Sequence, residues 1–411
     1  MDNRRALSCI FFCFVAILFT IGGVCTATAY GASVGTAQLA ANALQITVTQ
    51  SAHGTIVPGT TTVDFGANQT FVITPDAGYH IASITANGVT VAIASPSGQS
   101  YQFSGISANG SLTANFALNM PSLGLVLAAV VIGAAMAIYA LWPNPLTFIL
   151  AVVVIGSRQL GLAILMHDAA HGVLMRTRWL NEWVGQWLCA YPVLGEMIGY
   201  RHYHLVHHRR TQQFDDPDLA LSAKFPITKE SFKRKMIRDL TGQTGFKQRK
   251  AQFIRALGDP GQSLVERAKT FWTRIGPQYS AQLILLALMT AFGKPHYFLM
   301  FWVLPNITWQ MAITRVRNIA EHAVVPDDND VFRNARTTYA SWWVRALVAP
   351  YWVNYHVDHH LLYYVSCYNL PKLHALLLAK GFRDKMEIQP DYVTLLRLAT
   401  SKPSPLAAHA T

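Results

Sequence analysis

Eight histidines of this chain form three tight clusters whose spacing would bring their imidazole rings together. They are His167 and His171 (HxxxH), His204, His207 and His208 (HxxHH), and His356, His359 and His360 (HxxHH). Residues three and four apart lie on one face of a helix, so each cluster would present two or three imidazoles to a single point. Neutral imidazole suits iron, copper, zinc and nickel. Three convergent clusters exceed the needs of one tetrahedral zinc, so we predict two metal ions close together.

Long apolar segments must position these clusters. Hydrophobic residues make up 52% of the 411-residue chain and charged residues 13%, which is too apolar for an ordinary soluble protein. Apolar runs cover residues 7–25, 123–142, 146–166, 280–292 and 297–314. Because about 20 apolar residues cross a bilayer, we predict a mainly α-helical integral membrane protein.

Proline-containing turns divide these runs into hairpins. Trp142-Pro-Asn-Pro145 separates 123–142 from 146–166, since proline both starts and interrupts helices. We predict one transmembrane hairpin there and a second at about 279–314. If both hairpins return to the same side, all three clusters meet at one membrane face, under a helical cap. The Trp-rich segment 178–200 is predicted to be an interfacial helix.

A ninth candidate ligand follows the last apolar run, in Asn318-Ile-Ala-Glu-His322. The i, i+4 spacing places Asn318 and His322 on one helical face. An isolated histidine is more often a satisfied polar residue than a ligand. We therefore predict no metal role for the remaining ones, which are His53, His80, His202, His296, His374 and His409.

Positive charge is concentrated after the first hairpin. Between Arg201 and Arg274 there are 16 Lys or Arg against 7 Asp or Glu, within a net charge of +12. A basic excess beside apolar spans marks the cytoplasmic side of a membrane. Because no nucleic-acid-binding motif accompanies this stretch, its predicted contact is an anionic lipid surface or an acidic redox partner.

The N-terminal part of the chain differs in character from the rest. Residues 1–30 combine two arginines, an apolar core and small residues, which predicts a signal peptide or an uncleaved membrane anchor. Residues 45–118 alternate in polarity between turn dipeptides such as Asn87-Gly88, and predict a small all-β module. The five cysteines show neither a disulfide framework nor a zinc ribbon.

The β module carries two motifs, Gly54-Thr-Ile-Val-Pro58 and Ala77-Gly-Tyr79. They resemble the divergent β-repeat modules of bacterial surface proteins, with an inert spacer or stalk as the alternative. An inside N-terminus would export this module and would also place the histidines outside, against the indication of the basic stretch. The side of the membrane on which the module lies therefore stays open.

Residues 120–385 resemble the integral-membrane fatty acid desaturase superfamily. The resemblance rests on the three histidine boxes in order, on their spacing from the hairpins, and on the contexts His167-Asp-Ala-Ala-His-Gly172, His207-His-Arg-Arg-Thr211 with Asp215-Asp-Pro-Asp218, and Tyr368-Asn-Leu-Pro-Lys-Leu-His374. It implies a non-haem di-iron centre that uses O2 and two electrons. It also implies that His322 is a ninth histidine ligand and that Asn318 acts through a bound water or as a weak ligand. Residues 386–411 would form a C-terminal tail.

Carboxylates near the boxes could orient the imidazoles by accepting a hydrogen bond from the second ring nitrogen. Asp168 and Asp358 lie inside boxes and are predicted to do so. Others could do the same, cap helices or pair with neighbouring arginines; they are Asp215, Asp216, Asp218 and Glu321. We predict no catalytic side chain beyond the metal ligands.

The expected function is that of a fatty acyl desaturase in a bacterial inner membrane, with its site on the cytoplasmic face. No haem-binding module or flavin fingerprint is visible in the sequence, so electrons would come from a separate ferredoxin- or cytochrome-type protein. A lipid or carotenoid hydroxylase or ketolase of the same superfamily is the main alternative, because the same di-iron oxidant serves both outcomes. A non-enzymatic surface protein with a membrane anchor is the remaining alternative, and it predicts no bound iron.

Overall fold

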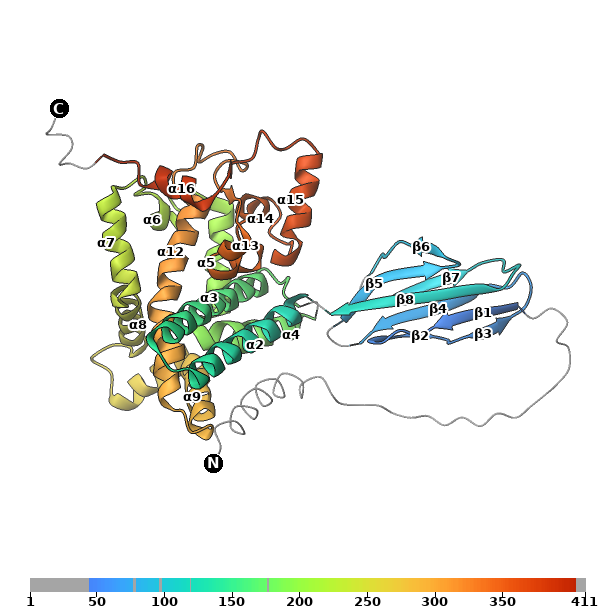
Figure 1. Ribbon diagram of the computed structural model, residues 1–411, viewed down its shortest axis with the longest axis horizontal. Coiled ribbons are helices and arrows are strands. Elements are labelled where there is room, and N and C mark those ends of the chain that lie inside the picture. The colour runs from blue at the N-terminus through green and yellow to red at the C-terminus, as the bar shows by residue number, and fades with distance from the viewer. Residues whose placement is uncertain (1–43, 77–78, 96–97, 119, 176, 404–411) are drawn as a thin grey trace. The chain divides into compact units, whose positions relative to one another are not determined.

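The computed structural model describes residues 44–403, except residues 77–78, 96–97, 119 and 176. These residues separate into two compact units that meet in sequence between Val126 and Leu127, and each unit is described by itself. The chain is mainly helical with an N-terminal β unit, as predicted (Figure 1). The predicted signal or anchor segment, residues 1–30, and His409 lie outside the described residues.

The β unit consists of two sheets. Its strands are β1 (Leu44–Thr49), β2 (Gly54–Val57), β3 (Thr61–Val63), β4 (Gln69–Pro75), β5 (Tyr79–Ala86), β6 (Val89–Val91), β7 (Gln99–Phe103) and β8 (Gly110–Leu118). Five strands pair in the order β3-β1-β8-β5-β6 and three in the order β2-β4-β7. Alternate residues such as Ile46 and Phe71 are fully buried in one core, because successive side chains of a strand face opposite ways. Asn87 and Gly88 have positive φ and form the predicted turn between β5 and β6.

The helical unit contains most of α2 and all later elements, which include two short strands, β9 (Thr337–Thr338) and β10 (Ile388–Gln389). Its α-helices are α2 (Met120–Leu141), α3 (Pro145–Ala170), α4 (Arg178–Val184), α5 (Met197–Arg210), α6 (Leu219–Ser222), α7 (Lys229–Leu240), α8 (Gln243–Ala256), α9 (Leu264–Ala291), α10 (His296–Phe298), α11 (Leu304–Ile307), α12 (Trp309–His322), α13 (Trp342–Leu347), α14 (His356–Leu361), α15 (Leu370–Ala379) and α16 (Tyr392–Ala399). The π turns η1 (Gly185–Ala190) and η3 (Leu299–Val303) and the 3-10 turns η2 (Tyr191–Val193), η4 (Pro350–Trp352) and η5 (Cys367–Asn369) join some of them.

Helices α2 and α3 follow one another across the predicted turn. Asn144 caps α3 by accepting hydrogen bonds from the backbone N–H groups of Leu146 and Thr147, and Pro145 occupies its first turn. Gly124–Leu141 and Pro145–Ala170 are long and apolar enough to cross a bilayer, and among the described residues they are the two helices that meet this criterion.

The second predicted hairpin is divided into shorter elements. Residues 280–292 cover the second half of α9, after Pro277, and end at its C-cap. Residues 297–314 cover α10, η3, α11 and the start of α12. Crossing of the bilayer by this hairpin therefore stays a prediction.

The predicted interfacial helix over residues 178–200 is likewise interrupted. It comprises α4, the π turn η1, the 3-10 turn η2 and the first turn of α5. Its three tryptophans, Trp179, Trp183 and Trp187, are all exposed. Exposed indole rings suit the boundary between lipid and water.

Helix α3 holds a central place in the helical unit. Almost every side chain from Ile155 to Ala170 is buried, because α3 packs against α5, α11 and α12. The Ser157 hydroxyl donates a hydrogen bond of 2.8 Å to the carbonyl oxygen of Leu347, which ties α3 to the C-terminal third of the chain. Since this packing limits the rotation of α3, the direction of His167 near its end is fixed.

Candidate metal centre

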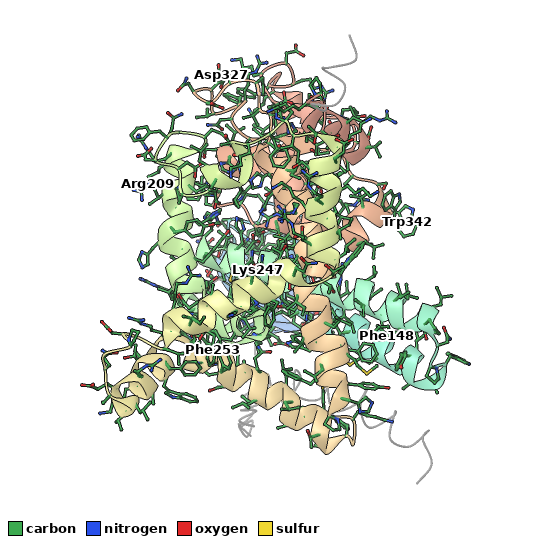
Figure 2. All side chains as sticks on the ribbon, turned by 90° about the vertical axis from the view of Figure 1, so that its left-hand side faces the viewer. Phe148, Arg209, Lys247, Phe253, Asp327 and Trp342 are labelled. Carbon is green, nitrogen blue, oxygen red and sulfur yellow. The ribbon has the colours of Figure 1, made fainter. Side chains whose placement is uncertain are left out.

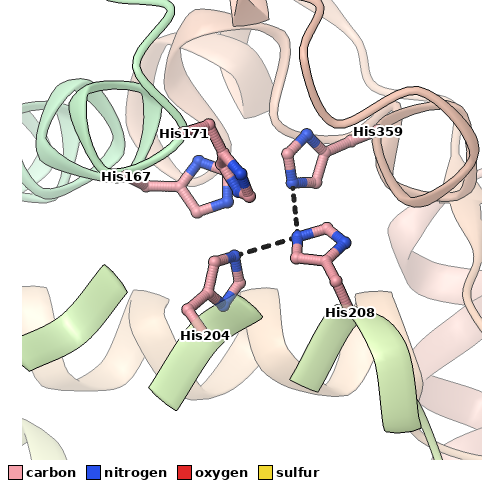
Figure 3. Close-up of side chains that lie close together, drawn as sticks. All are labelled: His167, His171, His204, His208 and His359. Carbon is pink, nitrogen blue, oxygen red and sulfur yellow. Dashed lines mark hydrogen bonds between the residues drawn. The ribbon is translucent and has the colours of Figure 1, made fainter. Parts of the chain in front are cut away.

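Five of the predicted ligands form a first histidine group. They are His167 and His171 at the end of α3, His204 and His208 on α5, and His359 on α14 (Figure 3). Each offers one ring nitrogen, and these nitrogens all lie within 4.8 Å of one another. The Nε2 atom of His208 lies 3.1 Å from that of His204 and 3.1 Å from that of His359.

The other four predicted histidines form a second histidine group beside the first. They are His207 on α5, His322 at the end of α12, and His356 and His360 on α14. The Nε2 atom of His322 lies 3.2 Å from that of His207 and 2.8 Å from that of His356, whose Nε2 lies 3.1 Å from that of His360. The structure therefore brings together all nine histidines that were predicted to bind metal.

The described histidines that were predicted not to bind metal lie outside both groups. His202 and His296 are exposed, and His53 stacks on Tyr79 in the β unit. His374 is buried, and its Nδ1 atom bonds to Asp358 at 2.9 Å.

Several ring nitrogens of the two groups have no hydrogen-bond partner among the described residues. Buried nitrogens without a hydrogen-bond partner among the described residues include both ring nitrogens of His167 and His171, and Nδ1 of His204, His208 and His322. Burial lowers the pKa of His171 to about 4 and the pKa of His208 to about 2, so these imidazoles are neutral and offer lone pairs at pH 7. Buried polar atoms are ordinarily partnered. Two metal ions that prefer nitrogen ligands would give one ring nitrogen of His167 and of His171 a partner and would bind the Nε2 atoms that the other histidines turn toward one another, so the donor set fits them.

Two carboxylates lie close to Nδ1 atoms of histidines in the second group. In the second group, Asp216 Oδ1 lies 2.8 Å from His207 Nδ1, and Glu321 Oε1 lies 3.6 Å from His356 Nδ1. Asp216 also accepts hydrogen bonds from the backbone N–H groups of Gln212 and Asp218, at 2.8 Å each. A carboxylate held in this way fixes the tautomer of the imidazole that it contacts.

Of the two carboxylates that were predicted to orient imidazoles, Asp168 lies beside a histidine of the first group, whereas Asp358 bonds to a histidine outside both groups. Asp168 accepts a hydrogen bond of 2.8 Å from the backbone N–H of Cys367, and its other oxygen is 3.5 Å from His167 Nδ1. Asp358 bonds to His374 and accepts a hydrogen bond of 2.7 Å from the hydroxyl of Thr337. Asp358 thus orients a histidine outside the two groups, whereas Asp216 and Glu321 were not distinguished from their neighbours by the sequence.

Comparison with known proteins identifies the helical unit. Residues 140–387, more than half of the chain, match the family model described as Fatty acid desaturase. The chain belongs to this family. Desaturases of the family are membrane-associated di-iron enzymes, so the two histidine groups are of the kind that the family requires.

Two further comparisons concern a single relative and the β unit. A desaturase relative, the dihydrorhizobitoxine desaturase of Bradyrhizobium elkanii, is 25% identical over 223 residues. These residues are 52% of this chain and 62% of the relative, so the match spans less than two thirds of that protein. Residues 44–120 match the model described as Divergent InlB B-repeat domain, which confirms the resemblance of the β unit to bacterial surface repeats.

A polar cavity adjoins the second histidine group of this desaturase-family chain. Its volume is about 190 Å³, and it reaches His204 of the first group. Tyr200, Tyr203, Gln212, Asp218, Arg317, Asn318 and Glu321 line it together with His207, His322 and His356. Asn318 thus shares one cavity with three histidines of the second group. A cavity of this size and polarity has room for water beside Asn318.

The end of α12, which carries His322, is held by Arg336. This side chain is fully buried, and it donates hydrogen bonds to the carbonyl oxygens of Ala323 at 2.7 Å and Val324 at 2.6 Å. Its Nε atom also pairs with Glu387 at 3.1 Å. In the desaturase fold of this chain, Arg336 therefore anchors the turn that follows the ninth histidine.

Replacing Arg336 by methionine is expected to lower the free energy of unfolding by about 3–5 kcal/mol, because two carbonyls and Glu387 lose a buried partner. The midpoint of thermal unfolding in detergent measures this loss. Arg333→Met is the matched control, since Arg333 is exposed three residues away. Equal midpoints for the two variants would show that Arg336 does not hold the end of α12.

Proposed function

We propose that this chain is an O2-dependent acyl desaturase. The reaction would convert CH2–CH2 in a lipid acyl chain, with O2, two electrons and two protons, into CH=CH and two waters. When bound, two irons would supply the oxidising chemistry that an unactivated methylene requires. The observation that carries the proposal is the pair of adjacent groups of buried and half-buried histidines in a chain of the desaturase family.

The residues of the two groups would divide the work of holding the metals. His167, His171, His204, His208 and His359 would hold one iron, and His207, His322, His356 and His360 the other. Asp216 would keep Nε2 of His207 free for the metal, because it accepts the proton on Nδ1. Asn318 would act through a water in the cavity that it shares with His322. Asp168 would orient His167. Asp358 would orient the histidines of the third cluster, His356, His359 and His360, only indirectly.

The finer organisation is part of the same proposal. We propose a signal or anchor over residues 1–30, a β module over 45–118, a membrane-embedded desaturase domain over 120–385 and a tail over 386–411. Both apolar hairpins would lie in a bacterial inner membrane, with the histidines on the cytoplasmic face, where a separate ferredoxin- or cytochrome-type donor can reach them. The acyl chain would enter from the bilayer, between the spans and the segment 178–200.

Product analysis separates desaturation from hydroxylation. The chain would be expressed in a lipid-rich host, and the lipids compared by mass spectrometry with those of a His359→Ala strain. Loss of two hydrogens from an acyl chain supports the proposal, whereas gain of one oxygen would establish the hydroxylase alternative. Because the relative named above is a dihydrorhizobitoxine desaturase, that compound is a further substrate to supply. A surface protein without enzymatic activity would show no product of either kind.

A further inference from the structure

Helices α7 and α8 and the first part of α9 form a basic surface that the histidine chemistry does not use. We call the exposed side chains of residues 229–274 the basic platform. Its exposed basic residues are Lys229, Lys233, Arg234, Arg238, Lys247, Lys250, Arg255, Lys269 and Arg274, against exposed Glu230, Asp259 and Glu266. These nine cations outnumber the three carboxylates threefold, so the platform carries a local positive field.

The platform is one continuous surface of the helical unit. Helix α7 packs against α8, and α8 packs against α9. Between α8 and α9 the rings of Phe253 and Phe271 meet edge to face at 5.3 Å. Figure 2 faces this side of the unit and shows α8 crossing it, with Lys247 and Phe253 labelled. Charges on the three helices can therefore act on one and the same partner.

Large apolar side chains are exposed among these cations. They include Ile237, Leu240, Phe246, Phe253, Ile254, Leu264, Val265 and Trp272, and Leu264 is 81% exposed. A face that only met water would not expose so many, and a face inside the hydrocarbon would not carry so many charges. Apolar groups interleaved with Lys and Arg are the composition of a surface that lies in the headgroup region of a bilayer.

The exposed cations of α8 have no anionic partner in the part of the chain that the structure describes. Lys247, Lys250 and Arg255 form no ion pair with a carboxylate of the described residues, in contrast to Arg210 and Arg315. They are thus available to an external anion. None of the three lines the cavity beside the histidines.

We propose that the basic platform binds the anionic headgroups of a phospholipid bilayer. Phe246, Leu264, Val265 and Trp272 would enter the acyl boundary, while Lys247, Lys250 and Arg255 would contact phosphates. Each cation close to an anionic surface contributes a factor of about five to binding. The platform would act in this way whatever reaction the histidines serve, because none of its residues belongs to the two groups.

Lipid selectivity of the full-length protein tests this proposal. The protein is placed in phosphatidylcholine nanodiscs that contain spin-labelled phosphatidylglycerol or spin-labelled phosphatidylcholine, and the fraction of motionally restricted label is measured at low and high salt. We expect phosphatidylglycerol to be preferred at low salt, and the preference to fall by about fivefold or more in Lys247→Gln/Lys250→Gln/Arg255→Gln.

A matched variant removes the same charge elsewhere. Lys372, Lys380 and Lys385 are exposed near α15, and their triple glutamine variant is expected to keep the wild-type preference. Equal selectivity in the platform variant and the wild type would overturn the proposal. Slower reduction of the platform variant by an acidic ferredoxin, with lipid selectivity intact, would also overturn it, because the platform would then be a protein-docking surface.

Discussion

The His322→Ala variant is expected to retain about one iron per chain instead of about two and to lose its activity. His322 lies between its neighbours in the second histidine group, with its Nε2 atom 2.8 Å from that of His356 and 3.2 Å from that of His207. Its removal would take away one of the four nitrogens proposed for one metal and none of those proposed for the other. Metal analysis of the purified variant, together with product analysis, measures both effects.

A neighbouring histidine provides the control for this substitution. His202 is exposed, lies two residues before the second box and contacts neither group. His202→Ala should therefore keep wild-type iron and activity. Full iron in the His322→Ala variant would show that His322 is not a ligand. Loss of both irons would show instead that the two groups bind metal as one unit.

The Asp216→Asn variant is expected to bind the second iron about 10- to 100-fold more weakly. Both oxygens of Asp216 accept hydrogen bonds, from His207 Nδ1 at 2.8 Å and from the N–H groups of Gln212 and Asp218 at 2.8 Å. An asparagine amide would direct its own N–H at one of these donors. The imidazole of His207 would then lose its fixed tautomer. Competition with a chelator, followed by metal analysis, measures the change in affinity without reference to activity.

Asp215 offers a matched control one residue away. Its carboxylate is exposed and pairs with the exposed Arg210 at 2.9 Å, and surface pairs of this kind contribute little. We expect Asp215→Asn to resist the chelator as the wild type does. Equal iron loss in the two variants, or none in Asp216→Asn, would contradict the role of Asp216.

The clustering of the nine histidines was predictable because their spacing is local. On a helix, His204 and His208 must share a face, whatever the rest of the chain does. His322 was found by the same rule, from its spacing to Asn318. The division of the nine histidines into groups of five and four depends on how α3, α5, α12 and α14 meet. Contacts between segments more than 100 residues apart cannot be read from spacing.

The carboxylates that contact the histidines were harder to predict, because their direction depends on the three-dimensional structure and not on local spacing. Asp358 lies inside the third box, but a helix turns by about 100° per residue. This rotation directs it away from His356 and His360 and toward His374 on α15. Asp216 lies in a turn after the second box, where backbone N–H groups aim its carboxylate at His207. The sequence could name Asp216 as a candidate but could not choose it over Asp215.

The sequence predicted which parts of the chain are helical and which are β. It did not predict where the long apolar segments are divided into shorter helices. Alternation and turn dipeptides were enough to predict that residues 45–118 form an all-β unit. The apolar run at 146–166 became one long helix, because Asn144 and Pro145 start it and no later proline breaks it. Pro295 and Pro305 instead fall within the second predicted hairpin, at the starts of α10 and α11. Hydrophobicity alone does not reveal such breaks.

Metal analysis of the purified full-length protein, with Mössbauer spectroscopy to identify the metal, tests the central claim most directly. We predict about two irons per chain, both in nitrogen-rich coordination and both lost when His207 and His208 are replaced by alanine. Zinc as the sole bound metal, or no metal at all, would contradict the assignment of the two histidine groups to a di-iron centre.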